Sequence, residues 1–99
     1  MASFKELVQA DKPVLIDFHA TWCQPCKVVS PIVKQVKEKM GERVSVLKID
    51  VDRNQQLAQS LAIQGVPTLM IYRKGELKWR QSGVVSAEAL IQQLEYFGA

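Results

Sequence analysis

The sequence holds two cysteines, which lie three positions apart in the segment Cys23-Gln24-Pro25-Cys26. A disulfide between residues this close in sequence closes too short a loop to restrain the unfolded chain. We therefore expect the pair to serve chemistry rather than stability. A Cys-x-x-Cys segment between a strand and a helix is typical of sites that exchange thiols and disulfides.

The expected position of the pair makes the two thiols unequal. Cys23 is predicted at the start of a helix, where free backbone N–H groups and the positive end of the helix dipole lower the pKa of a thiol. We also expect Cys23 to be the more exposed of the two. Cys26 follows one helical turn later, within reach of Cys23. Pro25 suits a first helical turn, and Lys27 adds a nearby positive charge. Cys23 is therefore the predicted nucleophile.

A metal site is the main alternative use of two neighbouring cysteines. Structural zinc sites take four ligands, whereas His19 is the only histidine and no third cysteine is present. Carboxylates or a second chain would have to complete such a site. The residues therefore favour redox chemistry over metal binding.

Two charged residues interrupt apolar segments. Asp17 lies inside the run Val14–His19, and burying a carboxylate is costly. Such a group beside a Cys-x-x-Cys pair is a candidate functional residue, and a buried, fully hydrogen-bonded structural aspartate is the alternative. Lys48 interrupts Val44–Val51 in the same way. A functional lysine and a lysine that snorkels from a strand edge both remain open.

Local signals predict the elements that hold these residues. Ser3-Phe4-Lys5-Glu6 fits a capping box and begins a helix that Pro13 ends. The apolar run Val14–His19 predicts a strand buried on both faces. Thr21–Met40 has helical apolar spacing, with Gly41 as its stop. The predicted apolar faces are Phe4, Leu7 and Val8 in the first helix, and Val28, Val29, Ile32, Val33, Val36 and Met40 in the second.

The second half of the chain predicts two helices and three strands. The helix Thr21–Met40 connects the first strand to the strand Val44–Val51. A strand–helix–strand unit of this kind predicts two parallel strands joined by a right-handed crossover. The final strands form an antiparallel hairpin around Lys74-Gly75. The strand Val44–Val51 is followed by a helix that Asp52 or Asn54 caps, which runs through Leu57, Leu61 and Ala62 and ends at Gly65. The strands Thr68–Tyr72 and Glu76–Ser82 come next. The last element is a helix capped by Ser86, with Leu90, Ile91, Leu94 and Phe97 on one face.

This order predicts an α/β fold in which a mixed four-stranded sheet carries helices on both faces. Ninety-nine residues with 47% hydrophobic and 23% charged residues suit one folded domain, residues 1–99, and exclude a disordered chain. The net charge of +3 comes from scattered basic residues, which disfavours nucleic-acid binding. No apolar run has the length of a membrane span. The charged segment Met1–Asp11 lacks a secretory signal, and we expect a cytoplasmic location.

The motif Trp22-Cys23-Gln24-Pro25-Cys26-Lys27, followed by Pro31, Val66-Pro67-Thr68 and Gly83, resembles the thioredoxin family. The resemblance extends over about residues 3–97 and implies the thioredoxin fold. It implies that Cys23 attacks a substrate disulfide and that Cys26 resolves the product.

The resemblance also implies roles for residues outside the motif. Asp17 corresponds to a buried carboxylate that moves protons to and from the resolving cysteine, with Lys48 as its lysine partner. Pro67 corresponds to a cis-proline that faces the disulfide. The residues of the implied substrate-docking surface are Trp22, Gln24, Pro25, Val66 and Gly83.

Three features depart from the family pattern. Gln24 stands where glycine is usual, which leaves the redox potential open. His19 stands where many members have tryptophan and others have small residues, a sign of tolerance. The usual first strand is absent, so we expect four strands rather than five and Val44–Val51 at the edge of the sheet, where Lys48 and Asp50 act as charged guards.

The resemblance implies an enzyme of cell redox homeostasis and electron transport that reduces disulfides in proteins. It needs no bound cofactor and receives its electrons from an NADPH-dependent thioredoxin reductase, and we expect a monomer. One alternative is an oxidant or isomerase that acts on folding proteins outside the cytoplasm. Another is a non-catalytic binding module that uses the surface around Trp22, Pro67 and Gly83, although both cysteines and Asp17 argue against it.

Overall fold

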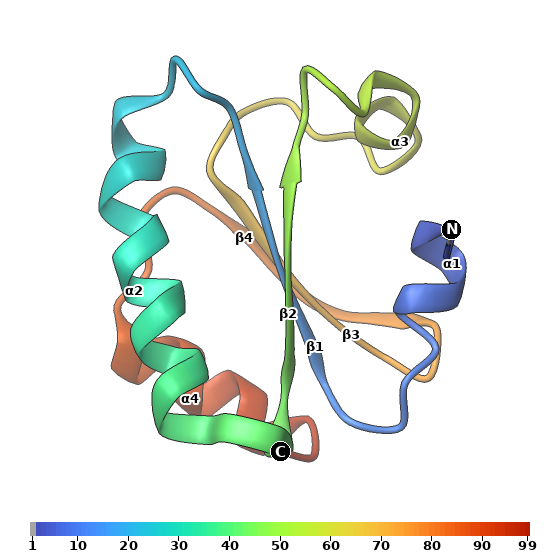
Figure 1. Ribbon diagram of the computed structural model, residues 1–99, viewed down its shortest axis with the longest axis vertical. Coiled ribbons are helices and arrows are strands. Elements are labelled where there is room, and N and C mark those ends of the chain that lie inside the picture. Colours follow the sequence, from blue (N-terminus) through green and yellow to red (C-terminus); the bar gives the residue numbers. More distant parts are fainter. Residues whose placement is uncertain (1) are drawn as a thin grey trace.

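The computed structural model describes residues 2–99, which form one mixed sheet with helices on both faces (Figure 1). The strands stand in the order β2-β1-β3-β4; β1 and β2 are parallel, and the other two pairs are antiparallel. The elements are α1 Phe4–Leu7, β1 Val14–His19, α2 Gln24–Met40, the single-turn helix η1 Gly41–Arg43, β2 Ser45–Asp50, α3 Gln55–Ser60, β3 Thr68–Arg73, β4 Glu76–Ser82 and α4 Ala87–Tyr96. The predicted four-stranded fold is confirmed within these residues, and β2 is one edge of the sheet.

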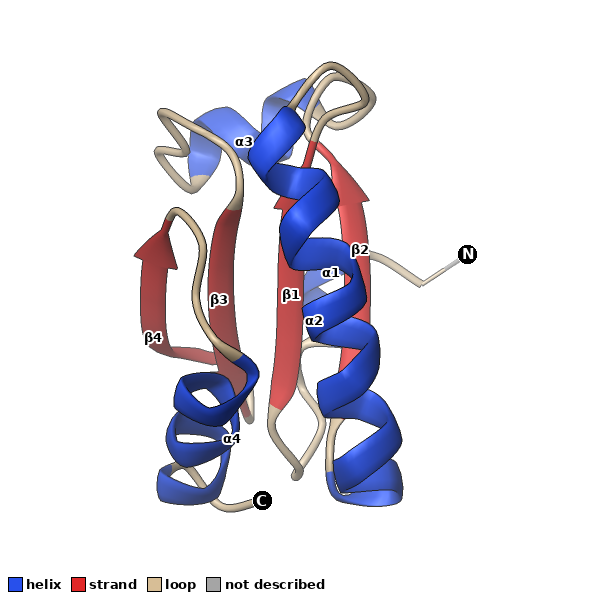
Figure 2. Cartoon of the chain, turned by 90° about the vertical axis from the view of Figure 1, so that its left-hand side faces the viewer, coloured by secondary structure: helices blue, strands red, loops and turns tan. Residues whose placement is uncertain are grey.

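The helices cover the two faces of the sheet in pairs. Figures 1 and 2 show α2 and α4 on one face, with α1 and α3 on the other. Side chains alternate between the faces of a strand. Leu15 accordingly packs on the side of α2 and α4, whereas Ile16 and Phe18 pack on the opposite side. The same alternation places Asp17 and His19 on the α2 side of the sheet.

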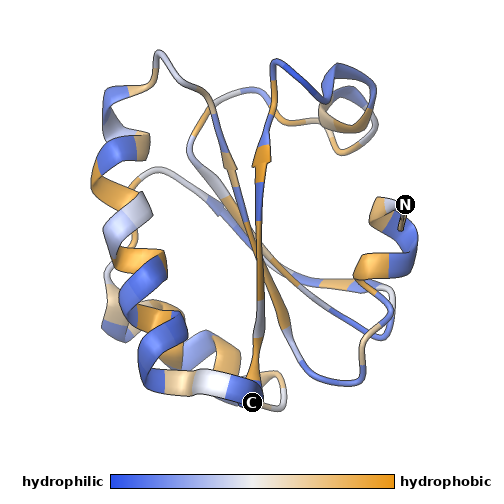
Figure 3. Ribbon diagram, viewed as in Figure 1, coloured by the Kyte–Doolittle hydropathy of each residue, from blue (hydrophilic) through white to orange (hydrophobic). Residues whose placement is uncertain are grey.

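Helix α2 begins later than its apolar spacing predicted, at Gln24 rather than Thr21. Cys23 has an extended backbone (φ −89°, ψ 111°) and caps the helix, so the turn before it cannot be helical. The buried stripe of α2 faces the sheet, in agreement with the hydropathy of Figure 3. Val28 is 53% exposed and lies off this stripe, contrary to prediction. As predicted, Gly41 ends the helix, with a φ of +55°.

Helix α1 is shorter than predicted and ends at Leu7 instead of continuing toward Pro13. Its capping box between Ser3 and Glu6 is present as predicted. The chain then leaves the helix because the carbonyls of Val8 and Ala10 accept hydrogen bonds from the turn between β3 and β4. Leu7 is 42% exposed, so the predicted apolar face is reduced to Phe4 and Val8.

Helix α3 also ends earlier than predicted, at Ser60 rather than near Gly65. Ala62 adopts a left-handed backbone with φ +54° and stops the helix. The N–H of Ile63 bonds the carbonyl of Ala58, and the N–H of Ala62 bonds that of Gln59, both at 3.0 Å. This pair of bonds is a Schellman motif, in which glycine normally takes the left-handed position.

The left-handed alanine predicts that Ala62→Gly stabilises the protein by about 0.5–1 kcal/mol, because glycine removes the steric cost of a positive φ. Urea unfolding with a fixed m-value measures the change. Ala58→Gly, inside the same helix, is the control and is expected to destabilise by about 0.5–1 kcal/mol. Equal or lower stability of the Ala62 variant would contradict the steric argument.

Candidate active site

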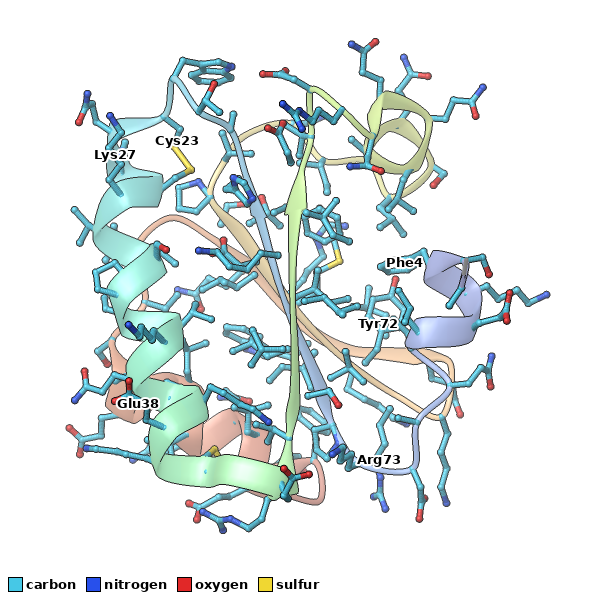
Figure 4. All side chains as sticks on the ribbon, viewed as in Figure 1. Phe4, Cys23, Lys27, Glu38, Tyr72 and Arg73 are labelled. Carbon is cyan, nitrogen blue, oxygen red and sulfur yellow. A yellow bond between two sulfur atoms is a disulfide. The ribbon has the colours of Figure 1, made fainter. Side chains whose placement is uncertain are left out.

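The two cysteines form a disulfide at the N-terminus of α2, with their Cα atoms 5.3 Å apart. Figure 4 shows the yellow sulfur–sulfur bond beside Cys23, with Lys27 on the same end of the helix. The Sγ of Cys23 accepts a hydrogen bond from the backbone N–H of Cys26 at 3.1 Å, in the manner of a helix cap. In the reduced protein this donor and the helix dipole favour the thiolate of Cys23.

Exposure does not separate the two cysteines. Cys23 is 3% exposed and Cys26 is 5% exposed in the disulfide form, so the expectation that Cys23 is the more accessible is wrong for this state. Both pack with Ala20 and against Val66. The first cysteine is buried because it caps the helix and packs against the next loop. The difference between the thiols therefore rests on the N-terminal position of Cys23.

Asp17 lies on β1 and is 1% exposed. Among the described residues, neither of its carboxylate oxygens finds a hydrogen-bond partner. Burial raises the pKa of Asp17 above its ordinary value, and the positive charges of His19 and Lys48 partly oppose the rise. The geometry disagrees with the alternative of a fully hydrogen-bonded structural aspartate, because a buried carboxylate without donors favours its protonated form.

A cavity of about 190 Å³ joins Asp17 to the cysteine pair. Cys26, but not Cys23, lies on its wall, which places the second cysteine on the side of the carboxylate. The other lining residues are His19, Ala20, Thr21, Lys27, Ser30 and Lys48. Cys26 and Asp17 therefore border one shared cavity.

Lys48 lies opposite Asp17 in the parallel ladder of β1 and β2. Its ammonium group nevertheless donates to the hydroxyl of Ser30 on α2, and its residue is exposed. The lysine therefore acts on Asp17 through its charge across the cavity. Lys48 thus lies on an edge strand with its side chain directed to α2, and its role toward Asp17 stays a prediction.

The loop before β3 lies against the cysteines. The Val66–Pro67 peptide bond is cis, as predicted, and Val66 packs on the cysteine cluster. Gly83 has a φ of +93°, and its N–H donates to the carbonyl of Pro67 at 2.9 Å. Gln24 and Pro25 are exposed beside the disulfide.

A surface groove of about 260 Å³ runs from the active site to α3. Trp22 and Val66 line it, together with Val51, Ile63 and three glutamines, Gln55, Gln59 and Gln64. Gly83 is not on its wall and borders the site through Pro67 instead. Of the five residues expected on the docking surface, Trp22 and Val66 therefore line this groove, whereas Gln24, Pro25 and Gly83 do not.

Trp22 is 67% exposed, and its indole Nε1 donates to Oδ2 of Asp52 at 2.8 Å. The sequence suggested Asp52 only as a helix cap, whereas Asn54 is the cap residue and makes no side-chain cap bond. The role of Asp52 escaped prediction because the pair is separated by thirty positions and no local pattern links them.

The anchored indole predicts that Asp52→Ala lowers kcat/KM for insulin reduction by about two- to tenfold, equal to about 0.4–1.4 kcal/mol for one exposed hydrogen bond. A freed indole must be ordered again when substrate docks, which costs binding free energy. Asp52→Asn keeps an acceptor oxygen and serves as the matched control, with a smaller loss expected. An unchanged kcat/KM in the alanine variant would show that the anchor has no part in docking.

A mixed sheet of this order, with a disulfide-bonded Cys-x-x-Cys pair at the start of its crossover helix, defines a thiol–disulfide oxidoreductase. The family model of thioredoxin matches residues 1–96. A thioredoxin-like protein of Synechocystis sp. is 42% identical over 97 residues, which cover 97% of this chain and 92% of that protein. The chain belongs to the thioredoxin family.

Other relatives and solved structures agree with this assignment. The chloroplastic thioredoxin Y of Oryza sativa is 42% identical over 95% of this chain, which spans 56% of the length of that relative. A mutant thioredoxin from Halobacterium salinarum has a TM-score of 0.86 and 36% identity, covering 100% of this chain and 88% of that one. Chloroplastic thioredoxin z has a TM-score of 0.81 and 38% identity, covering 88% and 79%.

Within residues 2–99, no three histidine, cysteine or acidic side chains gather as metal ligands. None of the helices in that range combines the length and apolar character needed to cross a bilayer.

Proposed function

We propose that this chain reduces disulfide bonds in other proteins, with Cys23 as nucleophile and Cys26 as resolving thiol. The observation that carries the proposal is that the two cysteines have different surroundings. Cys23 caps α2, whereas Cys26 shares a cavity with the buried carboxylate of Asp17. One sulfur is placed to be a thiolate. The other is placed beside a proton acceptor.

The reaction follows from this difference in two exchanges. The Cys23 thiolate attacks a substrate disulfide, forms a mixed disulfide and releases one substrate thiolate. Asp17 in its ionised form then takes the proton of the Cys26 thiol. The Cys26 thiolate attacks Sγ of Cys23, closes the disulfide and releases the second substrate thiolate. The raised pKa of Asp17 brings it toward that of a thiol, which suits a proton acceptor.

Substrate docking is assigned to the surface beside Cys23. Val66 lies against the cysteine cluster, and an extended substrate segment that pairs with its backbone would place a substrate disulfide near Cys23. Trp22, Gln24, Pro25 and Gly83 border this position, and Pro67 holds the loop. The groove toward α3 then receives the neighbouring substrate residues.

The finer assignments rest on the family resemblance. We propose that residues 1–99 act as one domain without a bound cofactor and that an NADPH-dependent thioredoxin reductase restores the dithiol. We also propose a cytoplasmic monomer with a role in electron transport, although relatives include chloroplastic and cyanobacterial proteins. The charged residues Lys48 and Asp50 on edge strand β2 support the monomer, because charges on an edge oppose pairing with another chain.

Insulin reduction, coupled to measurement of the Cys23–Cys26 reduction potential, tests the proposal. A reductase turns over insulin and has a potential near the thioredoxin value of about −270 mV. A potential near those of disulfide isomerase or DsbA, about −180 to −120 mV, would instead favour the oxidant or isomerase. Absence of turnover would favour the binding module.

A further inference from the structure

His19 is the only histidine of the chain, and its position in the fold gives it a neighbour in Asp17. The two residues are separated by one position on β1, so their side chains emerge on the same face of the sheet. Both line the cavity that also reaches Cys26. Asp17 is buried, whereas His19 is partly exposed. The histidine therefore shares a cavity with the buried carboxylate and is itself in contact with solvent.

In the proposed reaction Asp17 must be ionised before it can accept the proton of the Cys26 thiol, yet burial raises its pKa and favours the protonated form. A proton held on Asp17 must therefore reach solvent before Cys26 can resolve the mixed disulfide, yet Asp17 is 1% exposed and its carboxylate oxygens accept no hydrogen bond within the described residues. The cavity offers a small set of side chains for the transfer. Lysine ammonium groups already carry their protons near neutral pH, and a serine hydroxyl is a weak base. An imidazole takes up and releases protons in that range.

We propose that His19 transfers protons between Asp17 and solvent, and is thus a positioning and proton-transfer residue of the resolving step. The inference rests on the proposed function. The proton of the Cys26 thiol moves to the Asp17 carboxylate, from there to the neutral imidazole of His19, and then to water. No electron moves in these transfers; the electron pair stays with the Cys26 sulfur that attacks Cys23.

The charges around His19 fit such a transfer. Asp17 faces it from β1 and Lys48 from β2, while Lys27 and Cys26 face the cavity from α2. Asp50 is the partner of His19 in the ladder of β1 and β2, and its Oδ1 accepts the N–H of Asp52 at 2.8 Å. A protonated imidazole favours the ionised form of Asp17 and thus lowers its pKa. Transfer of the proton to His19 therefore helps return Asp17 to the form that accepts the next one.

Stopped-flow reduction of the aromatic disulfide DTNB separates the two exchanges, because each step releases one coloured thiolate. The first phase reports attack by Cys23 and the second reports resolution by Cys26. In His19→Gln, we expect an unchanged first phase and a second phase slowed by at least about tenfold near neutral pH, below the range of about 10²–10⁴ for a direct acid–base group. The rate of the second phase should rise with pH at a higher pH in this variant than in the wild type. The reason is that the variant lacks the positive charge of a protonated His19, which lowers the pKa of Asp17. Free imidazole in the buffer should restore the second phase in this variant and leave the wild type unchanged.

His19→Lys is the matched variant, since it keeps a positive charge but stays protonated near neutral pH. The inference requires this variant to be as slow as His19→Gln. A second phase at the wild-type rate in either variant would overturn the inference. If His19→Lys alone kept the wild-type rate, the effect of His19 would be due to its charge and not to proton transfer. Absence of a first phase in the wild type would overturn the proposed function itself and, with it, this inference.

Discussion

Cys23→Ser is expected to abolish disulfide reduction, whereas Cys26→Ser is expected to attack substrate once and then stop. The first change removes the sulfur that the helix N-terminus and the Cys26 N–H stabilise as a thiolate. The second change leaves that sulfur in place but removes the thiol that closes the cycle. The Cys26 variant should therefore accumulate one mixed disulfide per chain, and both variants should lose multiple turnover.

Mass spectrometry of trapped substrates and of the alkylated protein checks this assignment. At neutral pH and limiting iodoacetamide, the label should appear on Cys23 before Cys26. The similar burial of the two cysteines makes this a test of thiolate character rather than of access. Faster alkylation of Cys26, or a covalent substrate adduct on Cys26 in the wild type, would reverse the two roles.

Asp17→Asn is expected to make the protein more stable at pH 8 and slower as a reductase. The pKa of Asp17 is raised in the folded protein from an ordinary value of 3.8, with burial as the main cause. A folded pKa above the unfolded one stabilises the fold fully below the unfolded pKa, and this contribution is lost as pH rises through the folded pKa. At pH 8 the ionised carboxylate therefore penalises folding, and the neutral amide removes the penalty.

The expected gain at pH 8 is about 1–3 kcal/mol, the free energy that ionising the buried carboxylate costs the folded state and that a neutral amide does not incur. At pH 4 a larger share of the aspartate carries a proton in the fold, because its pKa is raised above 3.8, so the gain should be smaller. Urea unfolding at both pH values measures the difference. Asp11→Asn applies the same chemical change to an exposed side chain and should alter stability by less than about 0.5 kcal/mol.

Activity separates the functional reading of Asp17 from a structural one. An amide cannot accept the proton of the Cys26 thiol, so the second phase of DTNB reduction should slow while the first phase persists. A structural aspartate would instead predict a less stable variant, because its removal would leave a partner without its hydrogen bond. Lower stability at pH 8 together with unchanged turnover would end the proton-transfer assignment.

The sequence by itself determined the elements and the reactive pair, because these depend on residues that are close along the chain. The capping box at Ser3 and the stop at Gly41 are interactions within one helical turn. The spacing of Cys23 and Cys26 likewise places both sulfurs at one helix end. The order of strands and helices then restricted the topology to a parallel crossover followed by a hairpin.

The tertiary structure decided where two helices end and how the site is connected. Helix α1 stops because distant turn residues bond its following carbonyls, and α3 stops at Ala62 because the backbone turns left-handed there. The indole of Trp22 donates a hydrogen bond to Asp52, and the ammonium group of Lys48 donates one to Ser30. Only packing shows that Asp17 lacks donors and that His19 shares its cavity. Contacts between residues far apart in the chain leave no periodic or capping signal, so pKa tuning and proton routes emerge only once the sheet and α2 enclose them.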